Sequence, residues 1–222
     1  MAAAGDDTAA RAAMEGLLRD AWKPLYAYAR RAGCSPQDAE DAVQGFMASL
    51  LERGSLRSLS PEQGRFRNYL LAGIRNHLSD VASRAGAQKR GGGVEHLPLD
   101  GRNAEDGYLA EAAQMPTPER AFDRLWALGI LEKAKARLAE ECAASGKAAL
   151  FAALFPSAPG GDTENFAVLG ERLGMSETAL RSMAMRLRRR WRELIRHELE
   201  SVVNSRSEVD EEMASLQAAL ID

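Results

Sequence analysis

The chain has 222 residues, of which 45% are hydrophobic and 27% are charged. This composition is typical of a globular protein and excludes a disordered or fibrous chain. The longest uninterrupted apolar run, residues 148–155, is far too short to span a bilayer, and the N-terminus does not have the pattern of a signal peptide. We therefore expect a cytoplasmic protein with no membrane partner. The two cysteines lack the spacing of a disulfide framework or a zinc site.

The net charge of −3 hides a strong sorting of charge along the chain. Residues 64–90 contain six basic side chains and one acid, and residues 176–196 contain seven arginines and two glutamates. In contrast, residues 35–52 contain four acids and no base. Two basic segments of this kind are typical of a protein that binds nucleic acid.

The first half of the chain predicts three helices. Apolar residues at three-and-four spacing extend over residues 11–32. A second helix, over residues 36–53, has Ser35 as its N-cap, and Asp38 completes a capping box with it. After a loop that contains Ser, Pro and Gly, helical spacing returns over residues 66–85.

The second half follows an irregular segment, residues 88–118, which contains a GGG run and three prolines. Helical spacing then predicts a long helix over residues 118–144, a helical stretch to residue 155, and a final pair over residues 166–173 and 177–200. No stretch shows the alternation of a β-strand. The sequence therefore predicts an all-α fold of two small helical domains joined by a flexible linker.

The final pair of helices has the form of a helix-turn-helix. Gly174 permits the left-handed backbone that ends the first helix, Met175 can fill the angle between the helices, and Ser176 caps the second. One side of the second helix is apolar, and the other is rich in arginine. Residues near its start are placed to enter the major groove, and later ones to contact phosphates. We expect DNA contacts from Ser176, Glu177, Thr178, Arg181, Ser182, Met185, Arg186, Arg188, Arg189, Arg190 and Arg192.

The helix predicted over residues 36–53 begins with an acidic and polar patch. An acidic first turn stabilises a helix by itself, but further acids without a basic partner on the helix also suit a basic protein partner. The candidate residues of this surface are Asp38, Glu40, Asp41 and Gln44.

The helix predicted over residues 66–85 is basic. Aromatic residues beside arginine can stack unpaired bases, yet Phe66 and Tyr69 also fit the apolar stripe of the helix, so core packing is a second interpretation for both. The candidate nucleic-acid residues are Arg65, Phe66, Arg67, Tyr69, Arg75, Asn76 and Arg84.

Three stretches together resemble bacterial RNA polymerase sigma factors of the extracytoplasmic-function type, in the sigma-70 superfamily. Residues 35–52, SPQDAEDAVQGFMASLLE, are similar to the family's helix that docks on the clamp helices of the polymerase β′ subunit. Residues 66–84, FRNYLLAGIRNHLSDVASR, are similar to the helix that helps to melt and bind the downstream promoter element. Residues 169–188, LGERLGMSETALRSMAMRLR, are similar to the helix-turn-helix that binds the upstream element.

The resemblance implies a sigma factor that binds core RNA polymerase, recognises promoters and assists strand opening in transcription initiation. The implied partners are core polymerase, through its β′ clamp helices and β flap, double-stranded promoter DNA and the melted non-template strand, with an anti-sigma factor as a further candidate. The family's base-reading loop corresponds to residues 53–65. The implied domains are a region 2-like domain at 1–88, a linker at 89–117, a region 4-like helix-turn-helix domain at 118–200 and an acidic C-terminal extension at 201–222.

The chain departs from the family at three positions and adds a tail. Tyr69 replaces a usual Trp, Gly170 a usual Ala and Leu180 a usual Val, which bears on strand opening and local helix stability. Residues 118–155 and the C-terminal extension resemble a subgroup with an extended fourth region and such a tail. Seven acids follow from Glu198 onward, and we hypothesise that this tail folds onto the arginine-rich helix and masks it.

The alternative interpretation is a stand-alone helix-turn-helix transcriptional regulator that does not contact polymerase. An enzyme is not expected, because the Ser145-Gly146-Lys147 stretch lacks the upstream glycine of a phosphate-binding loop and the three histidines form no catalytic motif. We therefore expect no catalytic residue, no metal and no cofactor.

Overall fold

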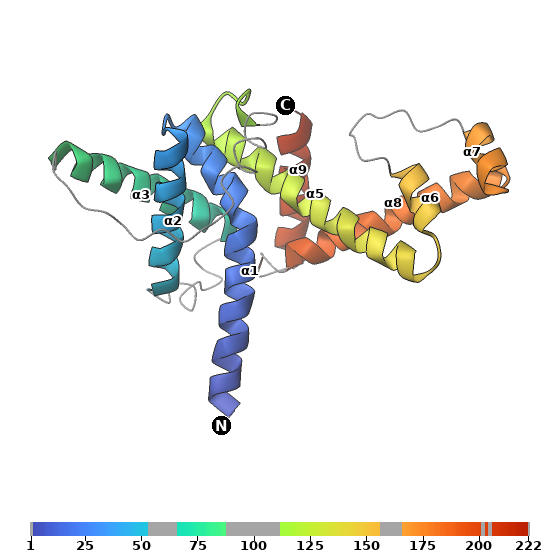
Figure 1. The fold of residues 1–222 in the computed structure, drawn as a ribbon, viewed down its shortest axis with the longest axis horizontal. Coiled ribbons are helices and arrows are strands. Elements are labelled where there is room, and N and C mark those ends of the chain that lie inside the picture. The colour runs from blue at the N-terminus through green and yellow to red at the C-terminus, as the bar shows by residue number, and fades with distance from the viewer. Residues whose placement is uncertain are drawn as a thin grey trace. The chain divides into compact units, whose positions relative to one another are not determined.

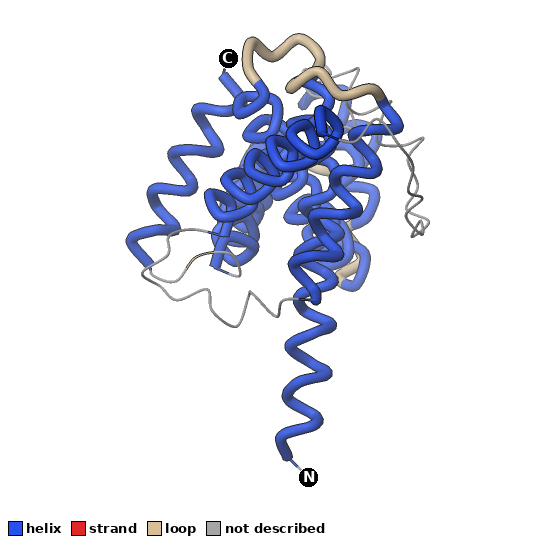
Figure 2. Tube along the Cα trace, turned by 90° about the vertical axis from the view of Figure 1, so that its left-hand side faces the viewer, coloured by secondary structure: helices blue, strands red, loops and turns tan. Residues whose placement is uncertain are grey.

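The computed structural model describes residues 2–52, 66–87, 112–155, 166–200, 203 and 206–221. Within these ranges each secondary-structure element is a helix (Figure 2), which confirms the predicted all-α class. The helices, labelled in Figure 1, are α1 (Ala2–Arg31), α2 (Pro36–Glu52), α3 (Phe66–Ala87), α5 (Pro118–Ala144), α6 (Ala148–Leu154), α7 (Phe166–Leu173), α8 (Glu177–Glu200) and α9 (Arg206–Ile221).

The chain forms two compact units. The first comprises Met1–Gly129 together with Val202–Asp222, and the second comprises Ile130–Ser201. This division differs from the predicted domains, because it falls within α5 rather than at the start of that helix and because the C-terminal extension joins the first unit.

The first turns of α5 belong to the first unit because their side chains are buried there. The ring centroids of Trp126 and Phe66, the first residue of α3, are 6.3 Å apart. Phe122 stacks on Trp126 with ring centroids 5.9 Å apart. The Tyr28 hydroxyl on α1 also donates a hydrogen bond to the Glu119 carboxylate at 3.4 Å. Tertiary packing therefore sets this boundary, whereas the sequence pattern marks only where the helix begins.

In the first unit α2 runs back alongside α1, and α3 crosses both (Figure 1). One side of α2 is buried, and it consists of Ala39, Ala42, Val43, Phe46, Met47 and Leu50. On α1 Leu18 is buried, whereas Leu17 is half-buried. Because α1 contacts two neighbouring helices, its buried surface is wider than a single stripe. The buried side chains of α1 are Leu18, Ala21, Trp22, Leu25, Tyr26, Ala27, Tyr28 and Ala29.

The second unit packs the C-terminal half of α5 with α6, α7 and α8. Its aromatic cluster places the Phe155 ring edge-on to Trp191, with centroids 5.7 Å apart, and stacks Phe155 on Phe151. This core fixes one side of α8 and leaves the other exposed. The buried side chains include Ala134, Leu138, Cys142, Leu150, Leu154, Leu169, Leu180, Ala184, Leu187, Leu194, Ile195 and Leu199.

Candidate functional site

The N-terminal turn of α2 presents the predicted acidic patch. The Ser35 hydroxyl accepts a hydrogen bond from the Asp38 amide at 3.1 Å and donates one to the Asp38 carboxylate at 2.6 Å. This capping box fixes the direction in which the helix leaves its turn. Asp38 and Asp41 are exposed, whereas Glu40 and Gln44 are half-buried. The patch is therefore accessible to a partner, most fully at its two aspartates.

The outer part of α3 carries the exposed members of the predicted nucleic-acid set. Arg75, Asn76 and Arg84 are exposed, and the neighbouring Val81 is 42% exposed. Tyr69 is half-buried, so part of its ring is accessible. The outer part of α3 thus carries positive charge together with apolar and aromatic surface, with Arg75 and Arg84 on opposite sides of the helix.

The first residues of α3 differ from the expectation of direct nucleic-acid contact. The Phe66 ring is buried against Trp126, so that the core interpretation of this residue is the observed one. The side chain of Arg67 is only 14% exposed and is engaged inside the first unit. Arg65 and the remainder of the expected base-reading loop, residues 53–65, lie outside the described residues.

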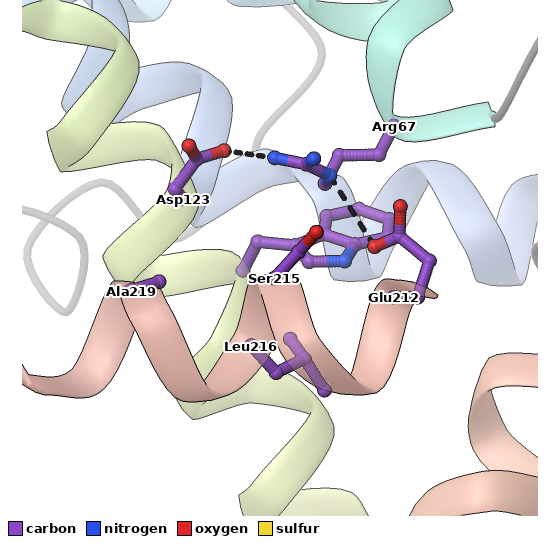
Figure 3. A pocket seen from close by; sticks show the side chains of 7 residues that line it. Arg67, Asp123, Glu212, Ser215, Leu216 and Ala219 are labelled. Carbon is purple, nitrogen blue, oxygen red and sulfur yellow. Dashed lines mark hydrogen bonds and ion pairs between the residues drawn. The ribbon is translucent and has the colours of Figure 1, made fainter. Parts of the chain in front are cut away.

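Arg67 lies between carboxylates from two other helices, as Figure 3 shows. Its guanidinium pairs with Asp123 on α5, and its Nε lies 3.4 Å from Oε2 of Glu212 on α9. Burial raises the pKa of Asp123, and the attraction of Arg67 opposes that shift. Sequence reasoning missed both Asp123 and Glu212, because no local pattern connects positions 56 and 145 residues away from Arg67.

This placement corrects the expectation for the C-terminal extension. The extension was expected to fold onto the arginine-rich helix α8, but α9 belongs to the first unit and pairs with Arg67. Total charge favoured α8, whereas the observed docking depends on one buried carboxylate, Glu212, and on the apolar residues around it.

The turn between α7 and α8 has the local geometry that the sequence predicts. Gly174 has φ of +64° and ends α7, and the Ser176 hydroxyl accepts a hydrogen bond from the Ala179 amide at 3.2 Å. The Met175 amide donates to the Gly170 carbonyl at 2.9 Å. A Cβ placed on Gly170 would lie 2.6 Å from the Met175 carbonyl oxygen. Glycine at this position therefore allows the turn to lie directly against α7.

The outer face of α8 exposes all eleven residues expected to contact DNA. Among them, Met185 is 69% exposed. Arg181 pairs with Glu177 one turn earlier and lies over the Phe166 ring, 5.3 Å from its centroid. This pairing holds the Arg181 guanidinium near the start of α8, where a recognition helix contacts base edges.

Other arginines of α8 differ in their ion pairs with neighbouring carboxylates. The Arg190 guanidinium donates to both carboxylate oxygens of Glu141 on α5, at 2.9 and 2.7 Å, and to Glu193 at 3.1 Å. These bonds raise the pKa of Arg190 and lower the pKa of Glu141. Arg186 and Arg188 make no ion pair within the described part of the chain. The exposed side of α8 thus contains arginines that are held in ion pairs and arginines that are not, among the described residues.

A comparison with protein families identifies part of this architecture. Residues 17–88 match the family model of sigma-70 region 2. The match spans most of α1 and all of α2 and α3, which carry the acidic patch and the exposed basic residues described above. No curated protein and no solved structure gives a significant match to the chain.

Two further properties limit the chemistry of the described residues. None of the described helices has both the length and the apolar character needed to cross a membrane. Within the same ranges, His, Cys, Asp and Glu side chains do not gather in a group of three or more that could hold a metal ion.

Proposed function

We propose that the chain is a sigma factor of the extracytoplasmic-function type, which binds core RNA polymerase and directs it to promoters. The observation that carries this proposal is the sigma-70 region 2 match over residues 17–88, on the helices that hold the acidic patch and the exposed basic residues. This match supports polymerase binding and promoter recognition. The activity is one of binding and positioning, without a catalysed reaction.

Each surface has a role under this proposal. The α2 patch, centred on Asp38 and Asp41, binds the clamp helices of the β′ subunit by charge complementarity. The exposed α3 side chains, Arg75, Asn76 and Arg84, hold the downstream element and the melted non-template strand. The outer face of α8 binds the upstream element in the major groove.

The direct test is gel-filtration co-elution of the full chain with bacterial core RNA polymerase. We expect stoichiometric co-elution of the wild-type protein and its loss in the Asp38→Arg/Asp41→Arg variant, because four units of charge change oppose a basic partner. The matched control is Glu15→Arg/Asp20→Arg, which makes the same charge change at exposed positions of α1. This control should still co-elute.

Two outcomes contradict the proposal. If neither the wild-type chain nor a chain lacking residues 204–222 co-elutes with polymerase, while both bind duplex DNA, the protein is a stand-alone helix-turn-helix regulator. If both double variants lose co-elution equally, the association depends on total charge, and the α2 patch has no specific role.

A further inference from the structure

Helix α9 docks on the first unit through one narrow face. Its buried residues, Val209, Glu212, Leu216 and Ala219, recur at three-and-four spacing, which places them on one side of a helix. Glu212 is 1% exposed, although glutamate is rarely buried without a partner. The other side of α9 is acidic and exposed, including Asp210 and Glu211. A buried carboxylate on an otherwise solvated helix indicates a specific partner.

That partner is Arg67, the second residue of α3. Arg67, Asp123 and Glu212 line one small pocket together with Trp126 and side chains of α9 (Figure 3). One guanidinium therefore links three helices, and its exposed fraction is 14%. In this arrangement Arg67 hydrogen-bonds Asp123 and lies 3.4 Å from Glu212 without a hydrogen bond to it, so both of the carboxylates beside it belong to the same chain.

The C-terminal end of α9 is attached to the same unit by a second arginine. Arg124 on α5 donates hydrogen bonds to the backbone carbonyls of Leu220 at 2.8 Å and Ala219 at 3.4 Å. These carbonyls belong to the last turn of α9, where they lack partners within the helix and where a cation is favourable. The docked position is thus fixed at two points along the helix.

We propose that α9 is a built-in inhibitor of DNA binding by the first unit, because it docks against α3 and α5 and holds Arg67 away from DNA phosphates. This inference rests on the proposed role of α3 in promoter binding. A phosphate presents oxygens to a guanidinium in the same geometry as a carboxylate, so DNA and Glu212 compete for one side chain. Release of α9 removes one of the two carboxylates beside Arg67 and opens its guanidinium to the DNA strand.

The docking is weak enough to be reversible. Three apolar side chains are buried among the described residues of α9, and two of them, Val209 and Ala219, are small. A buried ion pair adds little net stability, because loss of hydration offsets the attraction between its charges. When α9 leaves, Glu212 regains water. Binding of DNA can therefore displace the helix.

The test measures binding of the full chain to a fluorescein-labelled, 20-nucleotide single-stranded DNA of mixed sequence by fluorescence anisotropy. Glu212→Gln should tighten binding roughly fivefold and steepen the salt dependence by about 0.7 in the log-log slope, as one added phosphate contact predicts. Glu211→Gln removes the same charge from an exposed neighbour and should change affinity far less. In an Arg67→Ala background Glu212→Gln should have no effect.

A second measurement covers the case in which a substitution disturbs folding. A chain lacking residues 204–222 should bind the DNA more tightly, and a synthetic peptide of residues 206–222 should restore weak binding when added. The same peptide with Gln at position 212 should restore it less. Equal gains from Glu211→Gln and Glu212→Gln, or a gain that persists without Arg67, would overturn the inference and leave only general charge repulsion.

The two proposals fail separately. Loss of polymerase co-elution in all chains, with the Glu212 effect on DNA binding intact, removes the sigma-factor proposal and leaves α9 as an inhibitor of a DNA-binding unit. Normal co-elution with no Glu212 effect removes the inhibitory role of α9 alone.

Discussion

Arginine side chains on the outer face of α8 are not equivalent, although all of them are exposed. Arg190 is held by Glu141 and Glu193, so a phosphate can bind it only after these bonds are broken. Arg188 makes no ion pair within the described ranges. Its guanidinium can meet a phosphate without that cost. The intramolecular pairing therefore ranks the arginines as phosphate ligands.

We predict that Arg188→Ala weakens binding to a mixed-sequence 20-base-pair duplex and lowers the log-log salt slope by about 0.9, the value for one phosphate contact on B-DNA. Arg190→Ala removes the same charge and serves as the matched control. It should change the slope less, because the Arg190 side chain is already paired with Glu141 and Glu193. Fluorescence anisotropy across a salt series measures both. A larger slope change for Arg190 would show that its carboxylate partners release it readily.

The residue scale also shows what could be predicted from sequence. The helical period alone places Arg188 and Met185 on the exposed face of α8, and both are exposed. The partner of Arg190, by contrast, is Glu141, 49 residues earlier. No pattern within α8 identifies it, because the pairing depends on how α5 and α8 pack. The local sequence therefore predicts which side of a helix a residue lies on, but it does not predict the partner of an ion pair between two helices.

The ends of the helices could be predicted because they also depend on local sequence. The starts of α2 and α8 depend on the caps Ser35 and Ser176, whose hydrogen bonds lie within three residues. The inward position of Phe66 and Arg67 at the start of α3 was not predictable, since their neighbours come from α5 and α9. The basic segment therefore predicts a nucleic-acid surface with more accessible side chains than the structure shows.

The contact between α7 and the turn before α8 depends on a missing side chain. Gly170→Ala places a methyl group 2.6 Å from the Met175 carbonyl oxygen, which is backbone and cannot move aside alone. We predict a loss of about 1–3 kcal/mol in the free energy of unfolding of the second unit, because the clash outweighs the better helix propensity of alanine. Urea unfolding followed by circular dichroism measures the change.

Gly129→Ala, at the last residue of the first unit's part of α5, provides a reference for helix propensity, because nothing outside the backbone of its own helix turn lies within 4 Å of the new methyl group. That variant should gain up to about 1 kcal/mol from helix propensity alone. If Gly170→Ala is instead as stable as Gly129→Ala, the turn shifts to admit the methyl group. The alanine that the sigma-factor resemblance leads us to expect would then fit this chain equally well.

At the scale of the whole molecule, the C-terminal extension belongs to the first unit. Its total charge favoured the arginine-rich helix α8, but charge alone does not determine where a helix docks. The deciding features are the buried Glu212 and the hydrogen bonds of Arg124 to the end of α9. They connect α9, at the C-terminal end of the chain, to Arg67 on α3 and to the first half of α5.

Removal of residues 204–222 should therefore affect the two units differently. Hydrogen exchange measured by mass spectrometry should rise in peptides from residues 118–129, because loss of α9 exposes Trp126 and hydrates Asp123 and Arg67, which weakens local packing. Peptides from α7 and α8 should keep their wild-type rates. Full-length Glu211→Gln provides the control for lost charge, and it should leave both regions unchanged. Faster exchange in α8 after truncation would place the tail on the helix-turn-helix, where its charge first suggested it.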